Sequence, residues 1–138
     1  MRCSLFDEDE PAELMEEIQL ILNRGQITNE LAYLVCVAED PSERINGFIE
    51  VSIRPRAPLS GGDSIAYVEA LFVRPEARRQ GIARGLLQMG ETWAISKGRA
   101  EYWVDTDPKY ESAQLLYGAY GFEEVSRSAE EILYRKTL

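Results

Sequence analysis

The chain of 138 residues contains no histidine. That absence excludes a Ser-His-Asp triad, a Cys-His pair and any histidine-ligated zinc site. The two cysteines, Cys3 and Cys36, are too few for a disulfide scaffold or an all-cysteine zinc site, and a reducing compartment is the simpler interpretation. We therefore expect no metal, and any chemistry must use carboxylates, tyrosines, backbone groups or a cofactor.

Long apolar runs are also missing. The first ten residues hold no apolar core of signal-peptide length, and no stretch approaches the roughly 20 apolar residues that cross a bilayer. The chain has no low-complexity tract, no repeat at solenoid periods and no composition shift that marks a linker. We predict a single cytoplasmic domain over residues 1–138 without a membrane partner.

Positive charge is in the minority. The 15 basic side chains stand against 24 acidic ones, so the formal net charge is −9. Such a field repels nucleic acid and anionic membranes and attracts cationic partners. An acidic surface that only aids solubility is the alternative. The composition thus argues against a nucleic-acid partner and is compatible with a cationic one.

What the chain does have is a regular alternation of helical and strand patterns. Apolar residues recur at helical spacing in 11–24, 82–97 and 112–120. Strand patterns cover 32–38, 47–53, 65–73, 101–105, 122–126 and 132–135. The apolar stripe of the long middle helix comprises Ile82, Leu86, Met89 and Trp93. This order predicts an α/β chain with a mixed sheet.

The segment from Val73 to Arg84 joins a mostly apolar strand to the clearest helix. A helix start exposes unpaired N–H groups and a partial positive charge, which together bind phosphate. Gly81 lets the backbone approach an anion, and Arg78, Arg79 and Arg84 reverse the charge locally. The spacing fits neither a Walker loop nor a Rossmann fingerprint. An ordinary loop with solvated arginines is the alternative.

Two motifs lie in the second half of the chain, Arg78-Arg79-Gln80-Gly81-Ile82-Ala83 and Leu116-Tyr117-Gly118-Ala119-Tyr120-Gly121-Phe122. The first fits R/Q-x-x-G-x-G/A and the second L-Y-x-x-x-G-F, and together they resemble the signatures of the GNAT superfamily of N-acetyltransferases. The resemblance covers nearly the whole chain. It implies the GNAT fold, an α/β (α+β) architecture with a mixed, mostly antiparallel central sheet flanked by helices. Because the chain begins inside the family's first helix, we expect the N-terminal strand to be missing.

Further segments are similar to one branch, the aminoglycoside 6′-N-acetyltransferases. They are 47–54, 67–75, 121–124 and 134–136. This resemblance implies transfer of an acetyl group from acetyl-CoA to the 6′-amino group of an aminoglycoside, a cationic small molecule. The alternatives are a polyamine or a protein amino group as acceptor, or a CoA-binding module without turnover. An exposed sheet edge makes a homodimer plausible.

The resemblance also assigns the cofactor site. Backbone groups of the strand end would meet the pantetheine and the thioester carbonyl, where one N–H contributes about 3 kcal/mol to oxyanion stabilisation. The amides that open the helix would hold the diphosphate. The expected cofactor-binding residues are Leu71, Phe72, Val73, Arg78, Arg79, Gln80, Gly81, Ile82, Ala83 and Arg84.

Two carboxylates are candidates for the acceptor side. Asp105 and Glu69 stand on strands that flank the family's cleft, and paired carboxylates attract an ammonium group and accept its proton. Asp105 is our first choice for amine binding and deprotonation, and Glu69 is the second. The alternatives are a structural hydrogen-bond partner for Glu69 and a turn or helix cap before Pro108 for Asp105.

Two aromatic residues complete the expected site, and a third is expected in the core. The resemblance implies that Tyr117 donates a proton to the leaving thiolate, although a core tyrosine is the alternative. Phe6 resembles the family's aromatic residue near the aminoglycoside pocket. We expect Trp103 to pack in the core rather than line the cleft.

Overall fold

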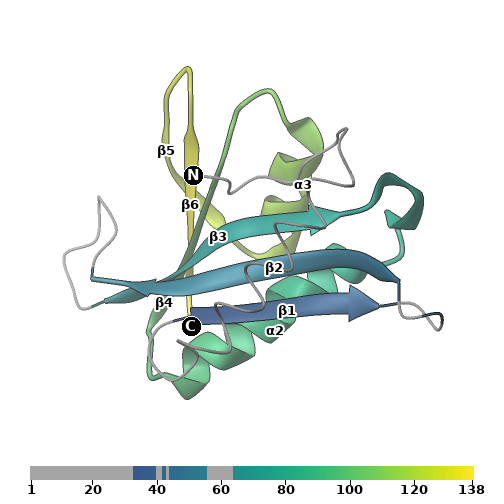
Figure 1. Ribbon diagram of the computed structural model, residues 1–138. Helices are drawn as coiled ribbons and strands as arrows, with labels where there is room; N and C mark the ends of the chain where they lie inside the picture. Colours follow the sequence, from purple (N-terminus) through teal and green to yellow (C-terminus); the bar gives the residue numbers. More distant parts are fainter. Residues whose placement is uncertain (1–32, 40–41, 43, 56–63) are drawn as a thin grey trace.

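The computed structural model describes the chain except for residues 1–32, 40–41, 43 and 56–63. The described part folds into one sheet with helices packed on it (Figure 1). Its elements are β1 (Tyr33–Glu39), β2 (Ile45–Arg54), β3 (Ile65–Val73), the 3-10 turn η1 (Pro75–Ala77), α2 (Ile82–Ser96), β4 (Glu101–Thr106), α3 (Glu111–Tyr120), β5 (Glu123–Arg127) and β6 (Ile132–Thr137). The helix expected over 11–24 lies outside the described residues.

The six strands lie in the order β1-β2-β3-β4-β6-β5. Every neighbouring pair is antiparallel except β3 and β4, which are parallel. A parallel pair needs a crossover connection, and α2 supplies it. The mixed, mostly antiparallel sheet expected from the sequence is confirmed, whereas the missing N-terminal strand concerns residues that the structure does not describe.

A β-bulge interrupts the pairing of β2 with β3. Glu50 opposes Ala70 and Val51 opposes Val68, so Glu69 is the extra residue. A bulge reverses the inside–outside alternation of the strand that carries it. Accordingly Val68 and Leu71, which differ by an odd number of positions, both pack in the main core. The bulge therefore re-aims the end of β3.

The sheet has two different faces. On the face covered by α2 and α3, the main core contains Ile49, Val68 and Val104, all fully buried. The opposite face carries a smaller cluster of Ile65, Tyr67, Trp103 and Leu133. Trp103 is fully buried there, so its expected packing role is confirmed.

The two parallel strands pair over a short distance only. Their register is limited to Ala66↔Tyr102 and Tyr67↔Trp103, near the start of both strands. From Val68 onward β3 has its ladder partner in β2 alone among the described strands. The parallel strands thus separate toward their carboxyl ends, which is also the end where α2 and α3 begin (Figure 1).

The buried face of α2 differs from the expected apolar stripe, of which Leu86 is buried and Ile82 and Trp93 are partly buried. Met89, expected in the stripe, is 52% exposed, and the buried residues are Leu86, Leu87, Gly90 and Ala94. The helix comes so close to the sheet that a Cβ on Gly90 would collide with the Tyr102 hydroxyl. Only a residue without a side chain fits at that crossing, and this rotates the buried face by one position.

Candidate functional site

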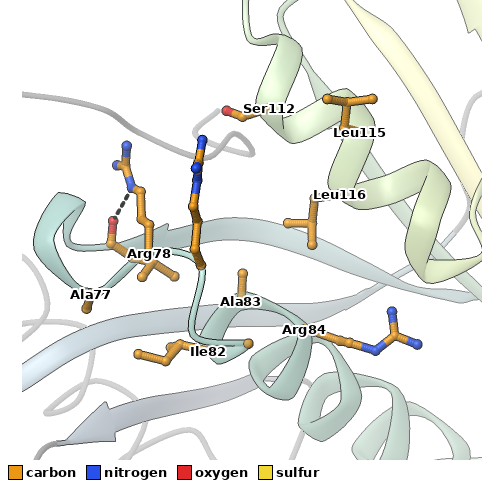
Figure 2. A pocket seen from close by; sticks show the side chains of 11 residues that line it. Ala77, Arg78, Ile82, Ala83, Arg84, Ser112, Leu115 and Leu116 are labelled. Carbon is orange, nitrogen blue, oxygen red and sulfur yellow. Dashed lines mark hydrogen bonds between the residues drawn. The ribbon is translucent and has the colours of Figure 1, made fainter.

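A cavity of about 530 Å³ opens between the start of α2 and the helix α3. Figure 2 shows Ala83 at the beginning of α2 and Leu116 on α3 pointing toward each other across it. The lining residues are Val73, Ala77, Arg78, Arg79, Gly81, Ile82, Ala83, Arg84, Ser112, Leu115 and Leu116. Three of these are arginines and none is acidic, so the lining is cationic in a chain of net charge −9.

The start of α2 is open toward this cavity. Its N-cap is Gly81, in the left-handed region at φ 80°, and no side chain caps the helix. The N–H groups of a helix's first turn have no acceptor within the helix, so they bind a capping side chain, water or a ligand. A Cβ built on Gly81 would meet no atom within 4 Å, so the space beside Gly81 is free. The helix start combines accessible donors with the positive end of the helix dipole.

Two arginines shape the turn that leads into α2. Arg78 donates from Nε to the carbonyl oxygen of Val73 at 2.9 Å, drawn as a dashed line in Figure 2, and so ties the turn to the end of β3. Arg79 has a positive φ of 63°, which costs a non-glycine residue roughly 1–2 kcal/mol. Such a local cost persists when the surrounding structure fixes the conformation, and it is found most often at binding sites.

The expected cofactor residues divide into two groups. The cavity is lined by Val73, Arg78, Arg79, Gly81, Ile82, Ala83 and Arg84. Leu71 and Phe72 are buried in β3, and Gln80 is exposed in the turn outside the lining. The diphosphate turn that we expected therefore faces a cavity.

The sequence did not predict which residues of α3 line the cavity. Ser112 and Leu115 were not singled out, and Leu116 was noted only as part of a motif. Leu115 is 75% exposed and lines the cavity from α3. A helical wheel of residues 111–120 would have placed Leu115 on the outward face of α3 and so have indicated it.

Asp105 lies near the end of β4, on the face opposite α2 and α3. It is 8% exposed, and Tyr67 on β3 donates its hydroxyl hydrogen to Oδ2 of this carboxylate. The turn before Pro108 is capped by Asp107, whose Oδ1 accepts from the Lys109 N–H at 2.9 Å. The capping function that was the alternative for Asp105 thus belongs to its neighbour.

Glu69, the bulged residue, accepts three hydrogen bonds from two residues of β2. Arg54 binds it through Nε and Nη2, both at 2.7 Å, and the Ser52 hydroxyl donates to it at 2.6 Å. The guanidinium of Arg54 also stacks 3.6 Å from the ring centroid of Tyr67. A chain of contacts therefore runs from Glu69 through Arg54 and Tyr67 to Asp105. This geometry favours the structural alternative for Glu69.

A third carboxylate, Glu131, stands beside this chain and was not found from the sequence. It precedes β6, where Leu133 pairs with Asp105, so Glu131 is a diagonal neighbour of Asp105 on the same face. Burial and then the charge of Asp105 raise the pKa of Glu131, and Arg54 opposes the shift. The register of β6 on β4 would have revealed Glu131, because this register places it near Asp105.

Tyr117 is fully buried and does not line the cavity. Its ring packs edge-on against Phe122 at 5.8 Å and against Tyr134 at 5.5 Å between centroids. These contacts favour the core alternative. Phe6, expected near the acceptor, lies outside the described residues.

Metal clusters and membrane-spanning helices are both absent from the described residues. These residues contain no group of three or more Cys, Asp or Glu side chains arranged to hold a metal ion. No helix among them combines the length and the apolar composition needed to cross a membrane.

Comparison with known proteins gives a match to a family over most of the chain. The sequence pattern of the acetyltransferase (GNAT) family matches residues 2–122. An aminoglycoside N(6′)-acetyltransferase type 1 of Klebsiella aerogenes is 35% identical over 127 residues, which are 92% of this chain and 82% of that protein. An enzyme of the same name from Acinetobacter baumannii is 31% identical over 128 residues, 92% and 83% of the two chains.

Solved structures agree with the sequence matches. An aminoglycoside 6′-N-acetyltransferase of Acinetobacter baumannii superimposes with a TM-score of 0.68 at 29% identity, covering 90% of this chain and 80% of that one. AAC(6′)-Iy, in complex with a bisubstrate analogue of CoA and acetylneamine, gives a TM-score of 0.70 at 28% identity over 78% and 74%. An N-acetyltransferase of Thermoplasma acidophilum in complex with coenzyme A shares the fold, with a TM-score of 0.72 at 21% identity over 89% and 70%.

Proposed function

The chain belongs to the acetyltransferase (GNAT) family, and from that premise we propose that it acetylates the 6′-amino group of an aminoglycoside. That it is an N-acetyltransferase using acetyl-CoA follows from the family and from relatives that cover most of its length. The observation that carries the finer proposal is the division of the site into two sides. An uncapped, cationic helix start lies on one face of the sheet, and a buried carboxylate lies on the other.

The residues of the first cavity fit acetyl-CoA. The space beside Gly81 is free, and the lining carries three arginines without a carboxylate. Such a site suits a diphosphate. The apolar side chains of Leu115 and Leu116 offer a surface for the less polar pantetheine arm. The cofactor supplies the acetyl group as an activated thioester. The chain holds it with Arg79 to Arg84 and, as the resemblance implies, with backbone groups of Leu71 to Val73.

Asp105 is assigned to the acceptor. An aminoglycoside carries its amines as ammonium groups near neutral pH, and the acceptor amine must lose a proton before it attacks. A carboxylate that is 8% exposed attracts this group and takes its proton directly or through water. The hydroxyl of Tyr67 orients the carboxylate from β3, the strand that also leads to the phosphate turn.

Glu69 and Tyr117 receive structural roles in this proposal. Glu69 binds Arg54 in a bidentate contact and accepts a hydrogen bond from Ser52, so we assign it to the positioning of Arg54 and Tyr67 and not to proton transfer. The aromatic packing of Tyr117 suits a core residue. A dedicated acid for the leaving thiolate is dispensable, since thiols have a pKa near ~8.5.

The test is a kinetic panel of kanamycin, spermidine and a lysine-containing peptide, with NMR identification of the product. We expect kanamycin to have the highest kcat/KM and to be acetylated at the 6′ position. If only the peptide reacts, the aminoglycoside proposal is wrong. Release of free CoA with any of the three amines excludes a module without turnover, and its absence with all of them supports one.

The same panel tests the role of Asp105. Asp105→Asn should lower kcat/KM for kanamycin by about 10²–10⁴, the usual contribution of a general base. The matched control is Asp107→Asn, the same chemical change two residues along the chain, where an Asn oxygen still accepts from the Lys109 N–H. Equal losses in the two variants would contradict the assignment.

A further inference from the structure

A second cavity of about 490 Å³ lies farther along α2. Its lining is polar and consists of Arg84, Gln88, Glu91, Thr92, Tyr120 and Lys136. The four residues from α2 share one face of the helix because they are spaced by three, four and seven or eight positions. Arg84 lines both this cavity and the first one. The two cavities therefore meet at Arg84.

Both carboxylate oxygens of Glu91 have partners on the cavity lining. Lys136 forms an ion pair with its Oε2 at 3.2 Å, and the Tyr120 hydroxyl donates to its Oε1 at 2.6 Å. Burial and then the contacts with Glu91 raise the pKa of Tyr120, so its hydroxyl remains a donor at neutral pH. Glu91 thus fixes the positions of Lys136 and Tyr120 on one wall of the cavity.

Arg84 provides the positive charge that Glu91 does not balance. Its guanidinium lies 5.5 Å from the ring centroid of Tyr120, and no ion pair of Arg84 occurs among the residues that the structure describes. Figure 2 shows its side chain extending along α2, away from Ala83. Two cations and one carboxylate give the lining a formal charge of 2 − 1 = +1, in a chain whose net charge is −9.

The position and the charge select the type of ligand. A positive lining disfavours an ammonium acceptor and suits an anion. The amide side chain of Gln88 and the hydroxyl of Thr92 add neutral donors that a phosphate oxygen accepts. Coenzyme A carries a phosphate monoester at the 3′ position of its ribose, separate from the diphosphate. With the diphosphate at the start of α2, the neighbouring cavity is the cationic space available to that monoester.

We propose that Arg84 and Lys136 bind the 3′-phosphate of coenzyme A in this second cavity and make the protein distinguish CoA from 3′-dephospho-CoA. The inference rests on the use of acetyl-CoA as donor. It is independent of which amine is acetylated.

The test measures the dissociation constants of CoA and dephospho-CoA by calorimetry at constant ionic strength, without an acceptor. The wild-type protein should bind CoA at least about tenfold more tightly, as expected for charge-assisted hydrogen bonds to a phosphate. Arg84→Met should weaken CoA binding by about tenfold and leave dephospho-CoA within about twofold, so that the preference disappears. Arg84→Lys should restore part of the preference. Lys136→Met should lower it to a smaller extent.

The matched control is Lys97→Met, which removes one positive charge from the other end of α2. It should leave both dissociation constants unchanged. Equal binding of the two nucleotides to the wild-type protein would overturn the proposal. An equal loss for both in Arg84→Met would do so too, because Arg84 would then serve the diphosphate alone. Thermal melting without ligand checks that each variant is folded. A preference for CoA in a protein that does not acetylate kanamycin would separate this proposal from the choice of acceptor.

Discussion

Two glycines of this chain have similar backbone conformations but lie at different ends of α2. Gly81 and Gly98 lie at opposite ends of α2 with φ of 80° and 72°, and a Cβ on either would meet no atom within 4 Å. Both thus require a left-handed backbone that other residues adopt at a cost. Only Gly81 lies beside uncapped amides in a cationic cavity. The pair therefore separates the effect of backbone strain from the effect on an anion.

Gly81→Glu places a negative side chain at the helix start. We expect it to weaken CoA binding by roughly a hundredfold or more, equivalent to about 3 kcal/mol. Gly98→Glu introduces the same residue and the same strain at the other end of the helix, and it should leave CoA affinity unchanged. Both variants should lose about 1–2 kcal/mol of unfolding free energy. Unchanged affinity in Gly81→Glu would remove the diphosphate from this turn and with it the cofactor assignment.

The helix α2 approaches the sheet closely at one point. A Cβ on Gly90 would collide with the Tyr102 hydroxyl and lie 3.0 Å from Cγ2 of Val51. Tyr102 is fully buried and donates to the Leu87 carbonyl oxygen at 3.0 Å. The hydroxyl therefore has little freedom to move away. Gly85 lies in the same helix and has no neighbour within 4 Å of its Cβ position.

Alanine at these two positions should have opposite effects. Gly85→Ala should stabilise the protein by about 0.5–1 kcal/mol, because alanine reduces the backbone entropy lost in a helix. Gly90→Ala gains the same propensity but overpacks the crossing, and a net destabilisation of about 1–2 kcal/mol is expected. Denaturant unfolding followed by circular dichroism gives both values. A stabilised Gly90→Ala variant would show that the helix and sheet can separate without loss.

The charged residues that the structure describes are divided between the two faces of the sheet. The chain has a net charge of −9, yet the residues that line the first cavity include three arginines and no carboxylate. Asp105 and Glu131 occupy the opposite face of the sheet. Under the proposed function, an anionic donor and a cationic acceptor would therefore meet opposite potentials on the two faces of one sheet.

Screening should affect a polycationic acceptor according to its charge. When ionic strength rises from about 0.05 to 0.5 M, the attraction by the acidic surface weakens. We expect KM to rise by roughly tenfold for an aminoglycoside with many amino groups and by less for one with few. Steady-state kinetics at saturating acetyl-CoA measures both slopes. Identical slopes for the two acceptors would assign the acidic composition to solubility instead.

Local signals in the sequence were sufficient for the elements and for one half of the site. The boundaries of the strands and of α2 and α3 agree with the expected ones within a few residues, because periodicity, Pro and Gly act over short distances. The turn from Arg78 to Ala83 was found for the same reason, since a helix start and its glycine are consecutive in the chain. The homodimer and the cellular location stay predictions.

The proposed acceptor side depends on residues that are distant in the chain. Glu131 and Asp105 become neighbours only through the register of β6 on β4. Glu69 binds Arg54 from a β-bulge, which the periodicity of the sequence does not reveal. The exposure of Met89 likewise follows from the closeness of α2 to Tyr102. The sequence by itself determined the elements and the turn proposed to bind an anion, because each is encoded within a few consecutive residues. Tertiary structure decided which carboxylates meet, because a register of strands places together residues that the chain keeps apart.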